Sequence, residues 1–221
     1  PVFAAALTLG GDDLFHGTMN DIVDWMQQVL LTPEGAFMAG EDGESRGQNG
    51  RHYLWRREQL KKLLSEDEYL LVETLFGLDK LANVENYWNL HRHDSYRSVV
   101  DRLSMTADEA DALLASAKSK MAAARLESEP RPVVDHKVIT AWNGLAIKGL
   151  ADAGRLAQRP DWIDLARSCA DFIRTHCWDD EKLCGTWHTS GRGHAACLDD
   201  YANVLAGLES LLQCGWSDDI A

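Results

Sequence analysis

Three loop segments carry the polar side chains best suited to chemistry. They are 41–45, 135–143 and 199–201. Carboxylates and an imidazole with aromatic faces beside them would suit general acid–base work on a polar substrate such as a sugar. The candidate acid–base groups are Asp42, Asp135, His136, Asp199 and Asp200, and the candidate substrate contacts are Lys137, Trp142, Asn143 and Tyr201.

The carboxylates also have a structural interpretation. Asp199 or Asp200 stands where the N-cap of the following helix is expected, and the helix dipole favours the charged form of such a carboxylate. Asp42 lies in a Gly-rich turn, where a solvated or turn-stabilising role is equally reasonable. Both interpretations stay open at this point.

The other candidates are ambiguous in the same way. His136 beside Asp135 would suit proton transfer, although an exposed loop histidine is commoner. Trp142 fits the packing of an inner helix as well as a stacking platform. Asn143 is expected inside a buried helix, where its amide needs hydrogen-bond partners.

Two kinds of helix must position these segments. Residues 12–31 and 161–177 place apolar side chains on one face, which is typical of a helix with one face to the core and one to water. Residues 139–156 and 201–212 are apolar all round and rich in small residues, which predicts helices buried on all sides. The opening residues 2–9 have the same character.

Buried and one-sided helices therefore alternate along the chain, and the sequence contains an internal repeat. A shift of 147 residues superimposes the apolar positions of the two one-sided helices, placing Phe15 on Trp162, Ile22 on Cys169, Trp25 on Phe172 and Met26 on Ile173. Repeated pairs of inner and outer helices build a solenoid or a closed ring, and the buried helices favour the ring. We expect an all-α fold, a partial α/α-barrel (toroid of helical hairpins), with the N-termini of its inner helices at one mouth.

The remaining elements are shorter. Strand-like pieces are expected mainly at 37–55, near 87–91 and around 183–188, as decorations on the helices, and further helices at 57–64, 67–76 and 106–126. No linker separates these segments, so residues 1–221 are predicted to form a single domain. Its inner helices should bury Leu145, Leu150, Leu205 and Leu208.

Charge and cysteine content narrow the function classes. A formal net charge of −13 argues against nucleic acid or an anionic membrane as partner. Five cysteines without a C-x-x-C pair fit reduced thiols and a cytoplasmic location. Cys177, Cys184, His188 and His194 cluster in sequence, but their spacing matches no standard zinc pattern, so we expect no metal and no cofactor.

The same loop segments carry a family resemblance. Residues 33–37, 41–45 and 50–55 are similar to a "GGF…EDADS…GKFYVW" run, residues 131–145 to "RP…DDKILTSWNGL", and residues 198–202 to "LDDYA". From about Ala4 to Gln213 the chain resembles the spermatogenesis-associated protein 20 family. His136 and Glu44 stand where these motifs have Asp.

The resemblance implies a larger protein. Family members combine an N-terminal thioredoxin-like domain with a six-hairpin, glycosidase-like α/α-barrel, so this chain would be part of the barrel, without the thioredoxin-like domain and the first hairpins. The outer helix that should follow 201–212 would also be missing. Similar barrels occur in sugar epimerases and glycoside hydrolases, although a shared fold does not transfer activity.

Two functions follow as alternatives. The first is a domain that binds or acts on a sugar-like ligand at the inner-helix mouth, which requires several carboxylates around one open cavity. The second is a non-catalytic structural or interaction module that serves the thioredoxin-like domain, in which the same residues cap helices. The sequence leaves the substrate and the reaction open.

Overall fold

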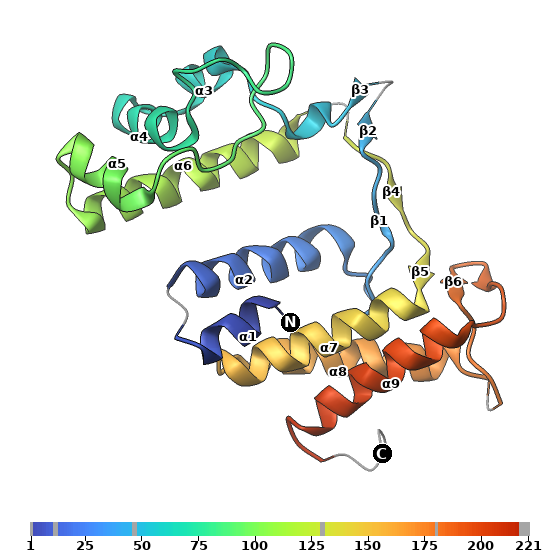
Figure 1. The fold of residues 1–221 in the computed structure, drawn as a ribbon. Helices are drawn as coiled ribbons and strands as arrows, with labels where there is room; N and C mark the ends of the chain where they lie inside the picture. The colour runs from blue at the N-terminus through green and yellow to red at the C-terminus, as the bar shows by residue number, and fades with distance from the viewer. Residues whose placement is uncertain (1, 11–12, 46–47, 129–130, 180, 217–221) are drawn as a thin grey trace. The chain divides into compact units, whose positions relative to one another are not determined.

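The computed structural model describes residues 2–10, 13–45, 48–128, 131–179 and 181–216 (Figure 1). It is mainly helical with a few short strands, which confirms the all-α prediction; closure into a barrel stays a prediction. The contacts divide the chain into unit 1 (Pro1–Glu41 and Val134–Ala221) and unit 2 (Asp42–Val133). Whether both belong to one domain also stays a prediction. No helix of the described residues is long and apolar enough to cross a membrane.

Unit 1 consists of helical hairpins. Its helices are α1 (Val2–Thr8), α2 (Asp13–Trp25) with a π-helical turn (Met26–Leu30), α7 (Thr140–Leu156), α8 (Pro160–Phe172) with a π-helical turn (Ile173–Cys177), and α9 (Leu198–Leu212). These bounds agree with the predicted helices to within three residues. Figure 1 shows α8 behind α7, with α9 beside them.

The internal repeat is present in the structure. A shift of 147 residues carries the bounds of α2 onto those of α8, and the bounds of the first π-helical turn onto those of the second. A single antiparallel β-bridge follows each turn, Leu31 with Phe37 in the first hairpin and Trp178 with Leu183 in the second. The two hairpins are therefore repeats of one unit.

Two glycines set how closely the inner helices approach. A Cβ added to Gly144 of α7 would lie 2.5 Å from the carbonyl carbon of Asn203, and one added to Gly207 of α9 would lie 2.6 Å from the carbonyl oxygen of Gly144. No side chain fits at either position. The backbones of α7 and α9 consequently touch, and Ile147 fills the space beside Gly207.

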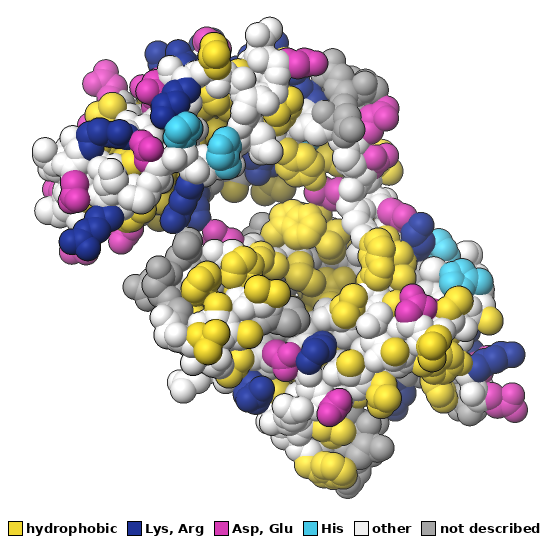
Figure 2. Space-filling view, viewed as in Figure 1, with side chains coloured by type: hydrophobic (Ala, Val, Ile, Leu, Met, Phe, Trp, Pro, Cys, Tyr) yellow, Lys and Arg dark blue, Asp and Glu magenta, His cyan; other side chains and the backbone are white. Residues whose placement is uncertain are grey.

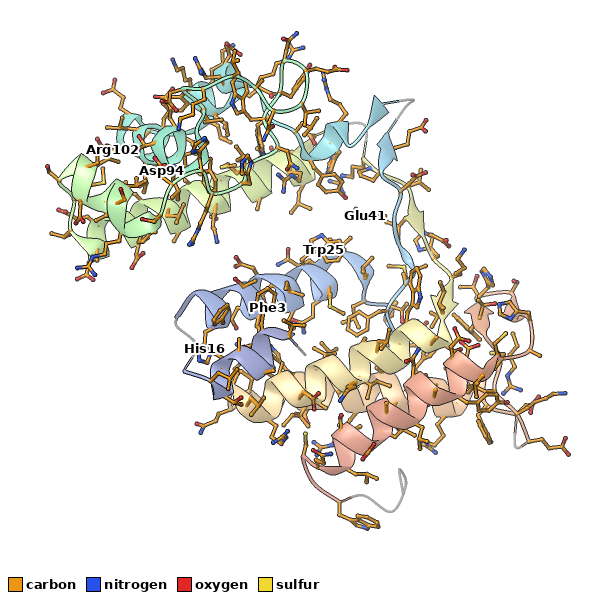
Figure 3. All side chains as sticks on the ribbon, in the orientation of Figure 1. Phe3, His16, Trp25, Glu41, Asp94 and Arg102 are labelled. Carbon is orange, nitrogen blue, oxygen red and sulfur yellow. The ribbon has the colours of Figure 1, made fainter. Side chains whose placement is uncertain are left out.

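The core of unit 1 lies between α7, α8 and α2. Trp162, Cys169 and Phe172 of α8 are buried there, with Ile147 and Leu150 of α7. Phe3 of α1 and Trp25 of α2 are partly exposed, and hydrophobic side chains gather on the visible face of this unit (Figures 2 and 3).

The inner helices are not buried on all sides, which corrects part of our prediction. Leu150 is 4% exposed, as expected, and Leu208 is half-buried. Leu145 and Leu205, however, are 50% and 68% exposed. Their helices are apolar all round, but within unit 1 half or more of the surface of each of these two residues stays uncovered.

Short strands connect the helices of unit 1. β1 (Gly40–Glu41) pairs antiparallel with β4 (Val134–Asp135). β5 (Val138–Ile139), β6 (Thr186–His188) and β7 (Gly191–Arg192) form an antiparallel sheet next to the start of α7. The strands at 134–139 were not predicted from the sequence.

Unit 2 is built on a long helix, α6 (Ala107–Glu127), packed against shorter ones. These are α3 (Arg57–Leu63), α4 (Glu66–Phe76) and α5 (Tyr96–Leu103), with a hairpin of β2 (Glu44–Ser45) and β3 (Gln48–Asn49) and a 3₁₀ turn (Arg51–Tyr53). Glu68 of α4 is 3% exposed and accepts hydrogen bonds from Lys120 (2.7 Å) and Ser116 (2.6 Å) of α6. These bonds hold the pKa of Glu68 at about 2.

Candidate functional site

The candidate site lies where α7 and α9 begin. The two helices run parallel, because Asp200 at the start of α9 contacts Ala141 at the start of α7, while Cys214 just beyond α9 contacts Ala151 further along α7. The predicted gathering of inner-helix N-termini at one end is therefore present for this pair.

Asp200 joins the two helix starts. Its carboxylate is 5% exposed and accepts the backbone N–H of Ala141 (3.0 Å) through one oxygen and that of Cys197 (2.8 Å) through the other. N–H groups in the first turn of a helix have no intrahelical partner, and a carboxylate is the acceptor that the helix dipole favours. Asp200 thus caps its own helix and also ties α9 to α7.

Asn143 and Tyr201 do equivalent jobs in the two repeats. Asn143 is 1% exposed; its Oδ1 accepts the N–H of Phe37 (2.8 Å), and its amide donates to the carbonyls of Phe37 (2.9 Å) and Ile139 (3.0 Å). The Tyr201 hydroxyl accepts the N–H of Leu183 (3.0 Å). Phe37 and Leu183 are the two bridge residues after the outer helices. Each inner helix therefore anchors the chain that returns from the preceding outer helix.

The segment 135–137 lies on the strand side of the same end. Asp135 of β4 is exposed and pairs with Lys137 (2.8 Å), and the bond from Lys137 is the main cause that lowers the pKa of Asp135. His136 is exposed with its Nδ1 3.0 Å from the sulfur of Met38. At neutral pH the Asp135 carboxyl is therefore ionised, which suits a base or a structural anion better than an acid.

The most accessible candidates are Asp199 and Trp142. Asp199 is exposed in the first turn of α9, and Trp142 is 55% exposed in the first turn of α7. Ligand atoms of Cys197, Asp199 and Asp200 lie within 4.8 Å of one another, a set that could approach a metal ion. Both oxygens of Asp200 already accept backbone N–H groups, however, so they are poorly placed to serve as ligands.

Asp42 belongs to unit 2. Its Oδ1 accepts the N–H of Glu44 (3.0 Å), and its own N–H donates to the carbonyl of Val133 (2.8 Å). These bonds hold the turn that precedes β2, which is the turn-stabilising role left open by the sequence.

One contact at the site was not singled out from the sequence. Gly185 donates its N–H to the carbonyl of His194 (2.8 Å), and a Cβ added to Gly185 would lie 2.2 Å from Cε1 of His194 and 3.2 Å from Oδ2 of Asp200. The imidazole and the carboxylate therefore both lie where a side chain at position 185 would be. Only the choice of glycine at 185 hints at this in the sequence.

A second feature of unit 1 is an apolar pocket between α8 and α9. It has a volume of about 240 Å³ and is lined by Ala170, Asp171, Ile173, Arg174, Trp178, Leu183, Val204 and Leu208. Asp171 and Arg174 form an ion pair (3.0 Å) at its lining. Tyr201 borders it through its bond to Leu183.

The chemistry available at the helix starts is limited. Asp200 is buried with both carboxylate oxygens bonded to backbone N–H groups, Asn143 is buried and bonded to backbone groups and to the Cys169 thiol, and Asp135 is held by Lys137. Asp199, His136 and the Trp142 ring remain accessible for contacts with a ligand.

The chain is similar in sequence to proteins from mammals and a nematode. No family model matches the chain. It is 26% identical to spermatogenesis-associated protein 20 of Mus musculus and of Homo sapiens, over 96% of the chain, and 26% identical to the uncharacterized protein B0495.5 of Caenorhabditis elegans over 90%. The resemblance inferred from the loop motifs is thereby confirmed. The chain spans about a third (31%) of the length of the curated relatives that it matches.

Proposed function

We propose, with the similarity to one part of spermatogenesis-associated protein 20 as premise, that unit 1 is a non-catalytic helix-docking module of a longer protein. Its docking surface is a groove formed by the outer side of α9 and the apolar pocket beside α8, hereafter the α9 groove. The occupant that fits the groove is an amphipathic helix from the remainder of that protein. The resemblance suggests that the module serves a thioredoxin-like domain.

The spacing of apolar residues on α9 carries this proposal. Tyr201, Leu205, Leu208 and Leu212 follow one another at i, i+4, i+7 and i+11, which places them on one face of the helix. Tyr201 is 39% exposed and Leu205 68% exposed. Leu208 also lines the pocket, so the stripe and the pocket are continuous. Large exposed apolar residues beside a pocket, here Tyr201 and Leu205, are typical of an interaction surface.

The internal repeat supports a helix as the occupant of the α9 groove. In the hairpin of α7 and α8, the inner helix is covered by an outer helix through Trp162, Cys169 and Phe172. α9 is an inner helix of the same character, and no described helix of unit 1 covers its Leu205. A helix like α8 would bury Leu205 and leave its polar face to the Asp171–Arg174 pair and to water.

The structural roles of the candidate polar residues also favour a non-catalytic module. Asp200, Asn143 and Tyr201, all candidates for chemistry, hold helix starts and returning chain in place. Their partners are backbone groups and, for Asn143, also the Cys169 thiol, which a substrate would have to displace at the cost of leaving buried donors unsatisfied.

The proposal is tested by placing a negative charge on the apolar face of α9. An uncovered α9 groove should bind a hydrophobic dye and promote self-association in sedimentation velocity, and Leu205→Glu should reduce both without lowering the thermal midpoint. Leu81→Glu is the matched control, since Leu81 is 96% exposed in unit 2. Equal behaviour of the two variants, or neither dye binding nor self-association in the wild type, would refute the proposal.

A second candidate function rests on the exposed groups at the helix starts. More than half of the surface of Trp142 is exposed in the first turn of α7. Asp199 is exposed in the first turn of α9, which runs parallel to α7. An aromatic face with a free carboxylate nearby suits a sugar-like ligand. Titration with sugars and amino sugars, followed by fluorescence, should then depend on both Trp142→Ala and Asp199→Asn. Binding that neither substitution changes would leave the docking module as the better account.

A further inference from the structure

We propose that unit 2 carries a binding site for the phosphate group of a small molecule, formed by Arg51 and Arg56 on the ring of Tyr87. This site is independent of the α9 groove and of the helix starts of unit 1. Its residues come from the segments 50–57 and 84–88, both wholly within unit 2.

Backbone pairing brings the two segments together. Trp55 and Trp88 exchange both of their N–H···O=C bonds (3.0 and 2.8 Å) in an antiparallel bridge. Tyr87, next to Trp88, is held in turn by two bonds with Val84 (2.9 and 3.1 Å) and is only 6% exposed. Its ring is therefore a fixed platform and not a mobile surface side chain.

Two guanidinium groups converge on this platform. The Cζ atom of Arg51 lies 3.3 Å from the centre of the Tyr87 ring and that of Arg56 lies 4.6 Å from it. Arg56 also donates a hydrogen bond to the Tyr87 hydroxyl. Each cation gains from the face of the ring, but two like charges on one side chain repel each other.

No carboxylate of the described residues neutralises either guanidinium. In the same unit Arg102 pairs with Asp94 at 2.8 Å (both are labelled in Figure 3), and in unit 1 arginines 159, 167, 174 and 192 each have an aspartate partner. The Arg51 guanidinium makes no hydrogen bond to any described residue, so its donors are available to a ligand.

Phosphate fits this set better than the alternatives. Planar guanidinium forks bind phosphate through paired hydrogen bonds, and a dianion neutralises two cations at once. A carboxylate carries one charge and would leave the second guanidinium uncompensated. A nucleic-acid backbone would require a row of cations, whereas only two converge here.

The test uses the 221-residue chain and inorganic phosphate as probe. Phosphate is titrated calorimetrically at constant ionic strength, with sodium chloride as the blank. Saturable binding is expected for the wild type, and Arg51→Gln and Arg56→Gln should each weaken it about ten-fold. Arg97→Gln is the matched control: Arg97 is an exposed arginine of the same unit, outside this stack, and its loss should leave the affinity unchanged.

Several outcomes would overturn the proposal. They are no saturable binding by the wild type, equal affinity in all variants, or an equal loss in the Arg97 control. Circular dichroism checks that each variant is folded. If the Gln variants are not, Arg51→Lys and Arg56→Lys keep the charge but lose the fork, and phosphate affinity that survives both would also refute the site.

Discussion

Replacing Asp200 by Asn tests how the two inner helices are joined. The carboxylate accepts one backbone N–H from each helix start, at 3.0 Å from Ala141 and 2.8 Å from Cys197. The amide keeps the size of the side chain but has one acceptor atom, so its NH₂ group must face one of the two N–H donors. One charge-assisted bond is lost and a buried donor is left unsatisfied.

The expected cost follows from these two losses. Hydrogen bonds to charged groups are worth roughly 1.5–3 kcal/mol, and an unsatisfied buried donor costs about 1–3 kcal/mol. Since the two effects overlap, we expect Asp200→Asn to lower the free energy of unfolding by roughly 2–4 kcal/mol. Asp199→Asn, one residue earlier and exposed, should change it by less than about 0.5 kcal/mol.

Urea unfolding measures both variants. Far-UV circular dichroism and tryptophan fluorescence are followed together, because coincident transitions are needed before a single free energy is assigned. Similar free energies of unfolding for Asp200→Asn and Asp199→Asn would refute the bridging role of Asp200. A loss of sugar binding without a loss of stability in Asp200→Asn would instead favour a ligand-binding role.

Three further predictions concern stability. Because the pKa of Glu68 lies at about 2, below its ordinary 4.5, its pair with Lys120 should contribute roughly 1–3 kcal/mol above pH 4.5 that is lost as the pH falls toward 2. The difference in unfolding free energy between wild type and Glu68→Gln, followed against pH, checks this. Gly207→Ala should cost more than about 2 kcal/mol in denaturant unfolding, since its Cβ would lie 2.6 Å from a backbone oxygen of the facing helix. Leu150→Ala should cost about 2–5 kcal/mol, but Leu145→Ala less than about 1, which thermal melts of both variants distinguish.

Hydrophobic periodicity was sufficient to place most helices. It identified α2, α6, α7, α8 and α9 to within a few residues. It missed the short helix Tyr96–Leu103, which spans only eight residues, too few for a helical period to stand out from the sequence alone.

Exposure could not be derived in the same way. A helix that is apolar all round predicts neighbours on every side, but the pattern does not say which chain supplies them. This is why Leu145 and Leu205 were predicted to be buried and are not. The 147-residue internal repeat, in contrast, was predicted correctly, because finding it requires only that the sequence be compared with itself.

The roles of the polar residues depend on distant partners. Asn143 binds the backbone of Phe37, 106 residues earlier, and Asp200 binds Ala141, 59 residues earlier. The sequence indicated that Asn143 needed partners and that Asp199 or Asp200 would cap a helix. Only the fold identifies the backbone groups that satisfy them.

The most direct test of the docking module is the exposure of α9 in a longer protein that contains this chain. Leu205 is 68% exposed here and Tyr201 39% exposed. An experimental structure of the longer protein should show an amphipathic helix over Tyr201, Leu205 and Leu208, with Leu205 buried. A groove that remains open to solvent there, with Leu205 still exposed, would contradict the proposed function.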